Sequence, residues 1–278
     1  MINTTIRWSL YIVSLIVLGP IAGLLMELSD SPDGTAGTVL VAGSPVLGIL
    51  GLVLGSAIAA GVGAVAAWLG GLRPGLTCAG IVLAWMAGMS SGLTSIVAAS
   101  DKGPWVALMI EGVLVGMCLL GIGVVVSLAA ARHRVPASSP HQPVASEHGL
   151  SFNKRSIAAL AAAVPAGAVA AWALAMTDLK GQVIAAATLA AVALTLLMRL
   201  IDLKTPALGA LAAGAVLAVF GPAYALAQVP AEGALASAYT QAIPGIVLVT
   251  PLDWAAGLLL GTPLGLAWSA SIAKRAET

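Results

Sequence analysis

The sequence predicts an all-α membrane protein, a bundle of eight transmembrane helices. Of the 278 residues, 60% are hydrophobic and only 8% are charged, whereas ordinary soluble domains carry about 25% charged residues. The apolar residues also form long blocks, and runs of about 18 or more residues are typical of membrane spans. Lys and Arg are concentrated in every second loop between these blocks, as the loops on one side of a membrane require.

Each of the eight blocks is long enough to cross a hydrocarbon core of about 30 Å at about 1.5 Å per residue. We expect helices because the blocks are too uniformly apolar for the alternating strands of a membrane barrel. The first block is long and has no signal cleavage site before the acidic segment that follows, so it is interpreted as a span. The predicted spans are 7–28, 45–70, 75–99, 104–131, 156–177, 181–201, 206–228 and 251–272.

The basic residues predict the orientation. Only Lys102 and Lys180 lie on one side of the predicted bundle, against ten on the other. The richer side is expected to be cytoplasmic, which gives a multi-pass protein of the plasma (bacterial inner) membrane with both termini inside. Tryptophans near the span ends resemble an interfacial belt, with Trp105 and Trp254 at the outer ends. The ten basic residues are Arg7, Arg73, Arg132, Arg134, Lys154, Arg155, Arg199, Lys204, Lys274 and Arg275.

Residues 132–155 are the only extended polar stretch, and their three prolines oppose helix formation. We expect a flexible cytoplasmic linker between a first four-span unit, 1–131, and a second, 156–278. All three histidines lie in this linker, at a spacing that fits no known metal site. Because no histidine lies within a span, haem ligation by two histidines in the membrane is excluded.

The two units resemble each other. Arg7 and Asp30 bracket the first span at the same separation as Arg155 and Asp178 bracket the fifth. Four spans return the chain to its starting side, so the copies of a 4+4 parallel repeat would face the same way, as in some transporters. Chance similarity between Gly- and Ala-rich segments is the alternative. The fourth and eighth spans also share a Trp-x6-Gly-x3-Gly pattern, formed by Trp105, Gly112 and Gly116 and by Trp254, Gly261 and Gly265.

Stripes of small residues recur every four positions in two spans. Such stripes let helix backbones approach closely in lipid. We expect these stripes to pack within the bundle. The alternative is that they dock a second copy of the chain or other membrane subunits. The lipid bilayer is expected to surround the bundle. Prolines are expected to kink four spans. The stripes are Gly51, Gly55, Ala59, Gly63 and Ala67, and Gly257, Gly261 and Gly265; the prolines are Pro20, Pro165, Pro222 and Pro263.

Glu111 is the exceptional residue, an acid about 10 Å inside the fourth span. A charge exposed to hydrocarbon costs roughly 2.5–3.5 kcal/mol on insertion scales, so we expect Glu111 to face the bundle interior or a wet cavity. A cluster of hydroxyls in the antiparallel third span lies at nearly the same depth. The candidate substrate-binding residues, all in the outer third of the membrane, are Glu111, Ser90, Ser91, Thr94, Ser95, Tyr224 and Gln228. The alternative is a glutamate that hydrogen-bonds a serine and only locks helix packing.

Three further charged residues are expected to be structural. Arg199 and Asp202 have the spacing of a helical pair at the membrane interface, and Asp253 is placed to cap the eighth span.

The sequence contains no P-loop, no GxSxG, no HExxH, no paired aspartates and no CxxCH. Cys78 and Cys118 lie in apolar runs. We therefore predict no catalytic, cofactor-binding or metal-binding residue and no enzymatic activity, and the net charge of +1 argues against nucleic acid. The predicted function is a permease or channel for a small solute or ion. The alternative is a non-catalytic structural or assembly subunit of a larger membrane complex.

Overall fold

The computed structural model describes residues 4–27, 37–41, 43–98, 100, 104–132, 153–229, 233–240 and 242–276. These residues form helices and no strands. Eight helices are long and apolar enough to cross a membrane, which confirms the predicted number. Residues 133–152, which include most of the predicted linker and its three histidines, lie outside the described residues. The spans are Thr4–Glu27, Pro45–Gly70, Leu72–Met89, Trp105–Ala131, Lys154–Leu174, Lys180–Ile201, Ala207–Gln228 and Pro251–Arg275.

The first span contains a π-helical turn. It is built from α1 (Thr4–Val13), the π-helix η1 (Ser14–Leu18) and α2 (Gly19–Glu27). Pro20 has no backbone N–H, and its ring would crowd the carbonyl four residues earlier in an ordinary α-helix. A wide turn before the proline relieves this conflict. Gly19 lies directly against the ring of Trp85, so no larger side chain fits there.

The second and third spans form a tight hairpin. Helices α3 (Pro45–Gly70) and α4 (Leu72–Met89) are joined by Gly71, whose φ of 87° favours glycine. The predicted span 75–99 is wrong as a single helix, because α4 ends at Met89 and a short helix α5 (Leu93–Ala98) follows. The break at Ser90–Gly92 exposes backbone groups that other segments bind.

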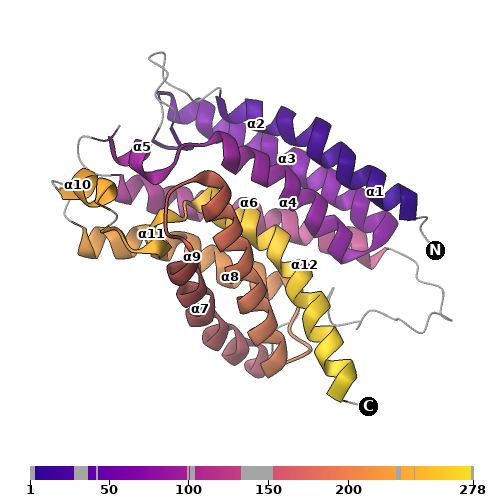
Figure 1. The fold of residues 1–278 in the computed structure, drawn as a ribbon. Coiled ribbons are helices and arrows are strands. Elements are labelled where there is room, and N and C mark those ends of the chain that lie inside the picture. Colours follow the sequence, from indigo (N-terminus) through magenta and orange to yellow (C-terminus); the bar gives the residue numbers. More distant parts are fainter. Residues whose placement is uncertain are drawn as a thin grey trace.

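Among the described residues, five helices lie between α6 (Trp105–Ala131) and the last span. They are α7 (Lys154–Leu174), α8 (Lys180–Ile201), α9 (Ala207–Gln228), and the short α10 (Ala234–Tyr239) and α11 (Gly245–Leu248). The last helix, α12 (Pro251–Ala276), packs against α8, α4, α9 and α6. Figure 1 shows α1–α4 on one side of α12 and α7–α8 on the other. Helix α12 is therefore central to the bundle.

The predicted small-residue stripes are covered by the protein's own helices. On α3, Gly51 lies against the carbonyl of Leu25 and Gly63 against the carbonyl of Gly75. On α12, Gly257, Gly261 and Gly265 all lie against α8. Gly112 and Gly116, which match Gly261 and Gly265 in the shared pattern, instead lie against α9. The common pattern therefore serves two different packing faces.

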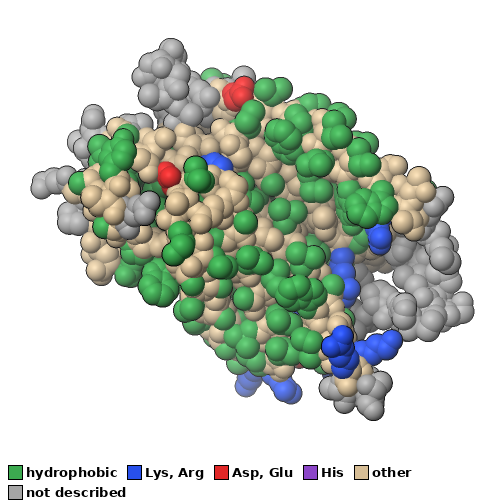
Figure 2. Space-filling view, viewed as in Figure 1, with side chains coloured by type: hydrophobic (Ala, Val, Ile, Leu, Met, Phe, Trp, Pro, Cys, Tyr) green, Lys and Arg blue, Asp and Glu red, His purple; other side chains and the backbone are tan. Residues whose placement is uncertain are grey.

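The surface has the charge distribution of a membrane-spanning bundle. Figure 2 shows hydrophobic side chains over the middle, most of the visible Lys and Arg toward the end that bears both termini, and acidic side chains with one basic side chain toward the opposite end. Trp8, Trp172 and Trp268 are exposed, as an interfacial belt requires. The predicted belt positions of Trp105 and Trp254 are wrong, because both side chains are buried and pack inside the bundle.

Candidate functional site

Glu111 lies on the second turn of α6 and is fully buried, so the carboxyl is held away from lipid. The backbone N–H of Leu40 donates to its Oε2 at 3.2 Å. The Thr38 hydroxyl also interacts with the carboxylate. The other carboxylate oxygen, Oε1, has no hydrogen-bond partner among the residues that the structure describes. Glu111 is thus a buried acid that is only half satisfied.

The segment that covers Glu111 is the non-helical stretch 37–41, just before α3. Thr38 and Val39 are fully buried. A turn holds the segment, since the Thr38 N–H donates to the Val41 carbonyl at 2.9 Å and the Val41 N–H donates to the Thr38 hydroxyl at 3.4 Å. Gly48 on α3 packs against the carbonyl of Val39. Irregular backbone is tolerated at membrane depth only where protein or a water-filled cavity surrounds it.

The same segment reaches the break in the third span. The Ser91 N–H donates to the Gly37 carbonyl at 3.0 Å, and the Ser90 hydroxyl donates to the Ala87 carbonyl at 2.8 Å. Ser90 and Ser91 are both buried. The sequence suggested a direct contact between Glu111 and these hydroxyls. The structure instead has segment 37–41 binding both: Leu40 and Thr38 interact with Glu111, and Gly37 accepts a hydrogen bond from the broken span.

The two remaining hydroxyls of the third span lie differently. The N–H of Thr94, in the first turn of α5, donates to Oδ2 of Asp178 at 3.0 Å, and Ser95 is exposed. Gly92 packs against Asp178 closely, so the α7–α8 connection and the broken span are in direct contact. Asp178 follows the predicted linker in the sequence and α5 precedes it, so this contact joins the two halves of the chain.

An ion pair lies close to Glu111. The ammonium of Lys180, at the start of α8, donates to both carboxylate oxygens of Asp253, at 3.1 and 3.2 Å. Asp253 is fully buried, and the Lys180 side chain is 16% exposed. Both charges act on Glu111. Lys180 is not among the residues that the sequence predicts for the site, although it is one of only two basic residues predicted on its side of the membrane.

Asp253 also closes the first turn of α12. Its Oδ2 accepts the Thr250 N–H at 3.0 Å and the Thr250 hydroxyl at 2.7 Å. Thr250 is therefore the capping residue, and Asp253 occupies the third helical position that pairs with it in a capping box. Every described contact of Asp253 is with a donor, so this acid is saturated.

Tyr224 and Gln228 are not brought to Glu111. Both are exposed, and the Tyr224 ring packs against Phe220, with ring centroids 6.1 Å apart. Gly221 and Ala225 form the buried face of the same helix. Since positions three or four apart share a face, Tyr224 and Gln228 lie together on the outward one.

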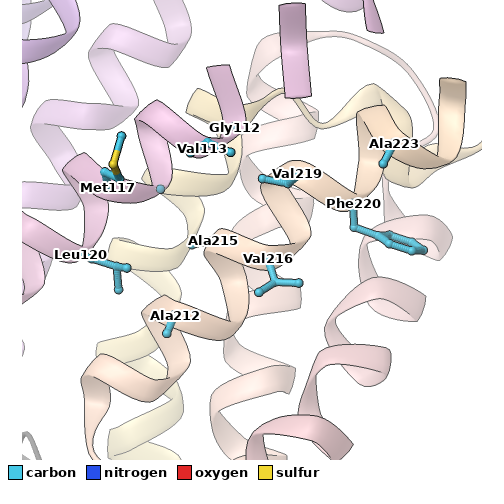
Figure 3. Close-up of a pocket in the computed structure, with 11 residues that line it drawn as sticks. Gly112, Val113, Met117, Leu120, Ala212, Ala215, Val216, Val219, Phe220 and Ala223 are labelled. Atoms are coloured by element: carbon cyan, nitrogen blue, oxygen red, sulfur yellow. The ribbon is translucent and has the colours of Figure 1, made fainter. Parts of the chain in front are cut away.

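An apolar groove of about 560 Å³ runs between α6 and α9. Figure 3 shows Val113 and Met117 on one wall and Val216 and Phe220 on the other. Every residue that lines the groove is apolar, and Glu111 is not among them. The groove and the buried acid are therefore separate features of α6.

We call the buried and half-buried polar contacts at this end of the bundle, with Glu111 among them, the Glu111 layer. Within the described residues, no group of three or more His, Cys, Asp or Glu side chains could hold a metal ion. Comparison of the chain with family models, with curated proteins and with solved structures found no match. The Glu111 layer consists of Thr38, Leu40, Ser91, Glu111, Asp178, Lys180, Thr250 and Asp253.

Proposed function

We propose that the protein is a plasma-membrane permease or channel for a small solute or ion, closed in this conformation, with Glu111 as the protonatable group of its site. The observation that carries the proposal is the fully buried carboxyl with one unpartnered oxygen among the described residues. Ionisable groups inside spans are costly and mark substrate or ion pathways by default. We propose no enzymatic activity for the protein.

Irregular backbone around the acid supports the same function. Segment 37–41 contacts the buried carboxyl through Leu40, and its Gly37 is hydrogen-bonded to the break at Ser90–Gly92. Transporter sites are commonly built from discontinuous helices whose freed backbone groups meet the substrate. Opening would require segment 37–41 to leave Glu111, which breaks the hydrogen bond from the Leu40 N–H and the interaction of the Thr38 hydroxyl with the carboxylate. The closed state is therefore held by few polar contacts.

The pairing of helices between the two units supports a 4+4 parallel repeat. Helix α6, the fourth span, packs on α9, the seventh, while α12, the eighth, packs on α4, the third. A pseudo-twofold axis along the membrane normal would produce this reciprocal arrangement. The different partners of the matched glycines on α6 and α12 show where the units diverge.

The basic residues at the end that bears both termini support a cytoplasmic location for that end. The Glu111 layer would then lie in the outer third of the membrane, with Lys180 and Asp253 toward the outer surface. Segment 37–41 would form part of an outer closure over the site.

The test is flux through purified protein in liposomes. Osmotic swelling reports permeation of glycerol, urea and glycine, and trapped dyes report H⁺, Na⁺, K⁺ and Cl⁻ fluxes under an imposed potential. We expect at least one flux above that of empty liposomes, and we expect E111Q to reduce it at least about tenfold, a change of about 1.4 kcal/mol in the barrier. The neutral amide keeps an acceptor for the Leu40 N–H but cannot exchange a proton.

The matched control is E27Q, because Glu27 is an exposed acid at the end of α2. E27Q should leave the flux unchanged. A fully active E111Q would defeat the assignment of Glu111, and a protein that passes none of these species would defeat the proposed function.

The α6–α9 groove favours the second candidate, a non-catalytic subunit of a larger membrane complex. Its apolar walls, with Met117 and Phe220 exposed, leave a surface that a helix of another membrane chain fits. Mild solubilisation of native membranes should then co-purify other membrane chains, and V216W should release them. A preparation that contains this chain alone would exclude this candidate.

A further inference from the structure

We propose that the ion taken up by the Glu111 layer is a proton and not a metal cation. This inference rests on the proposed function and names the ion that its site binds. The proton adds to the Oε1 atom of Glu111, which converts the carboxylate to a carboxylic acid and requires no other reactant.

The donors around Glu111 argue against a metal cation. Metal ions such as Ca²⁺ and Mg²⁺ need about six or more oxygen ligands. Here the Leu40 N–H is directed at Oε2, and the positive end of that dipole would repel a cation. The Thr38 hydroxyl is already the acceptor of the Val41 N–H. The described surroundings of the carboxyl therefore supply too few free oxygens for a coordination shell.

The nearby charges also favour a proton. Lys180 and Asp253 are held together by two contacts of 3.1 and 3.2 Å, so the ammonium already has a carboxylate partner. Of the elements packed on α6, α3 and α9 contain no charged residue, and Arg73 on α4 and Lys274 and Arg275 on α12 lie near the opposite end of the bundle. Among the described residues, an ionised Glu111 would thus have no cation paired with it alone, since Lys180 is paired with Asp253. Burying such a charge is costly, and a bound proton removes the charge.

The geometry also selects the oxygen. Oε2 accepts the Leu40 N–H and keeps this role as the carbonyl oxygen of the neutral acid. Oε1 has no described partner and is available to carry the proton. Proton binding thus leaves the contact with segment 37–41 in place, while loss of the proton would put a charge on a buried group. The protonated form is the one that suits the closed conformation.

Infrared difference spectroscopy of the purified protein tests the proposal directly. A protonated carboxyl gives a C=O stretch above the amide I band that shifts in D₂O. We expect this band in the wild type at neutral pH, its absence in E111Q and its retention in E27Q. Adding Na⁺, K⁺ or Ca²⁺ at constant pH should leave the band unchanged.

Two results would overturn the proposal: no band at neutral pH in the wild type, or a band that one of these cations removes. The wild-type spectrum is informative even if E111Q fails to fold. The proposed function stands or falls separately, since a flux that E111Q abolishes in a protein without the band would retain the permease and reject the proton.

Discussion

Two buried acids at opposite ends of the bundle have very different surroundings. Asp202, after α8, accepts hydrogen bonds from the Ser156 hydroxyl at 2.8 Å, the Thr205 hydroxyl at 3.1 Å and the Lys204 N–H at 3.1 Å. Glu111 accepts one backbone N–H, has the Thr38 hydroxyl beside it, and leaves an oxygen without a described partner. A saturated acid fixes its neighbours, whereas an unsaturated one retains capacity for a ligand or a proton.

Saturation also has an electrostatic consequence at Asp202. Burial raises the pKa of this carboxyl, but the hydrogen bonds from Ser156, Lys204 and Thr205 outweigh burial and hold the pKa below its ordinary value. The folded protein therefore favours the ionised form of Asp202. We interpret this acid as a structural clamp that joins the start of α7 to the α8–α9 connection.

The largest predicted effect comes from the Lys180–Asp253 pair, the saturated part of the Glu111 layer. K180M leaves the carboxylate of Asp253 buried without its cation, and we expect the free energy of unfolding to fall by about 3 kcal/mol. Thermal unfolding in detergent measures the loss. The double variant K180M/D253N should recover most of it. An unchanged midpoint in K180M would show that the pair contributes nothing and would remove the distinction between Asp253 and Glu111.

The second prediction concerns Asp202 and pH. D202N should lower the free energy of unfolding at pH 7 by about 2 kcal/mol while leaving flux unchanged, because hydrogen bonds to a charged acceptor are lost. Because its folded pKa is depressed, Asp202 contributes fully above the ordinary Asp pKa of about 3.9 and loses this contribution as pH falls through the folded value.

Unfolding curves from neutral pH down to pH about 3 test this dependence. The wild type should approach D202N in stability as the pH falls, and a constant gap over that range would contradict the depressed pKa. If D202N lost flux while its free energy of unfolding equalled that of the wild type, Asp202 would have a functional role, and the contrast with Glu111 would fail.

The smallest predicted effect compares two threonines. T205V removes a donor to ionised Asp202 and should cost about 2 kcal/mol, whereas T38V removes a donor to neutral Glu111 and should cost about 1 kcal/mol. Parallel unfolding measurements at neutral pH give both values. A larger cost for T38V would indicate that Glu111 is ionised when the protein is folded.

The helical architecture could be predicted from the sequence because the membrane imposes it. Eight apolar blocks require eight helices, and seven of the eight predicted spans agree with the structure to within a few residues. The third differs because its break depends on partners far away in the chain, Gly37 and Asp178. Hydropathy cannot detect such partners.

The candidate site was only partly predictable. Glu111 is identifiable because it lies well inside a span, whereas Glu27 and Asp253 lie at span ends, and its burial follows from the cost of exposing it to lipid. Its actual neighbours lie in segment 37–41, which looks like a loop. The apolar run Val39–Val41 next to Thr38 is the feature of the sequence that could have indicated that this segment is buried. Tyr224 and Gln228 were placed near Glu111 by depth alone, which does not determine the face of the helix.

The contact between α12 and α8 limits how these two helices can move against each other. Gly257, Gly261 and Gly265 bring the two backbones together over two turns, with no flexible side chains between them that could adjust. We therefore expect these helices to travel as one rigid pair. A displacement of this pair against α6 would occur where α12 meets α6. Because α6 carries Glu111, any such displacement would shift the acid relative to Lys180 and Asp253.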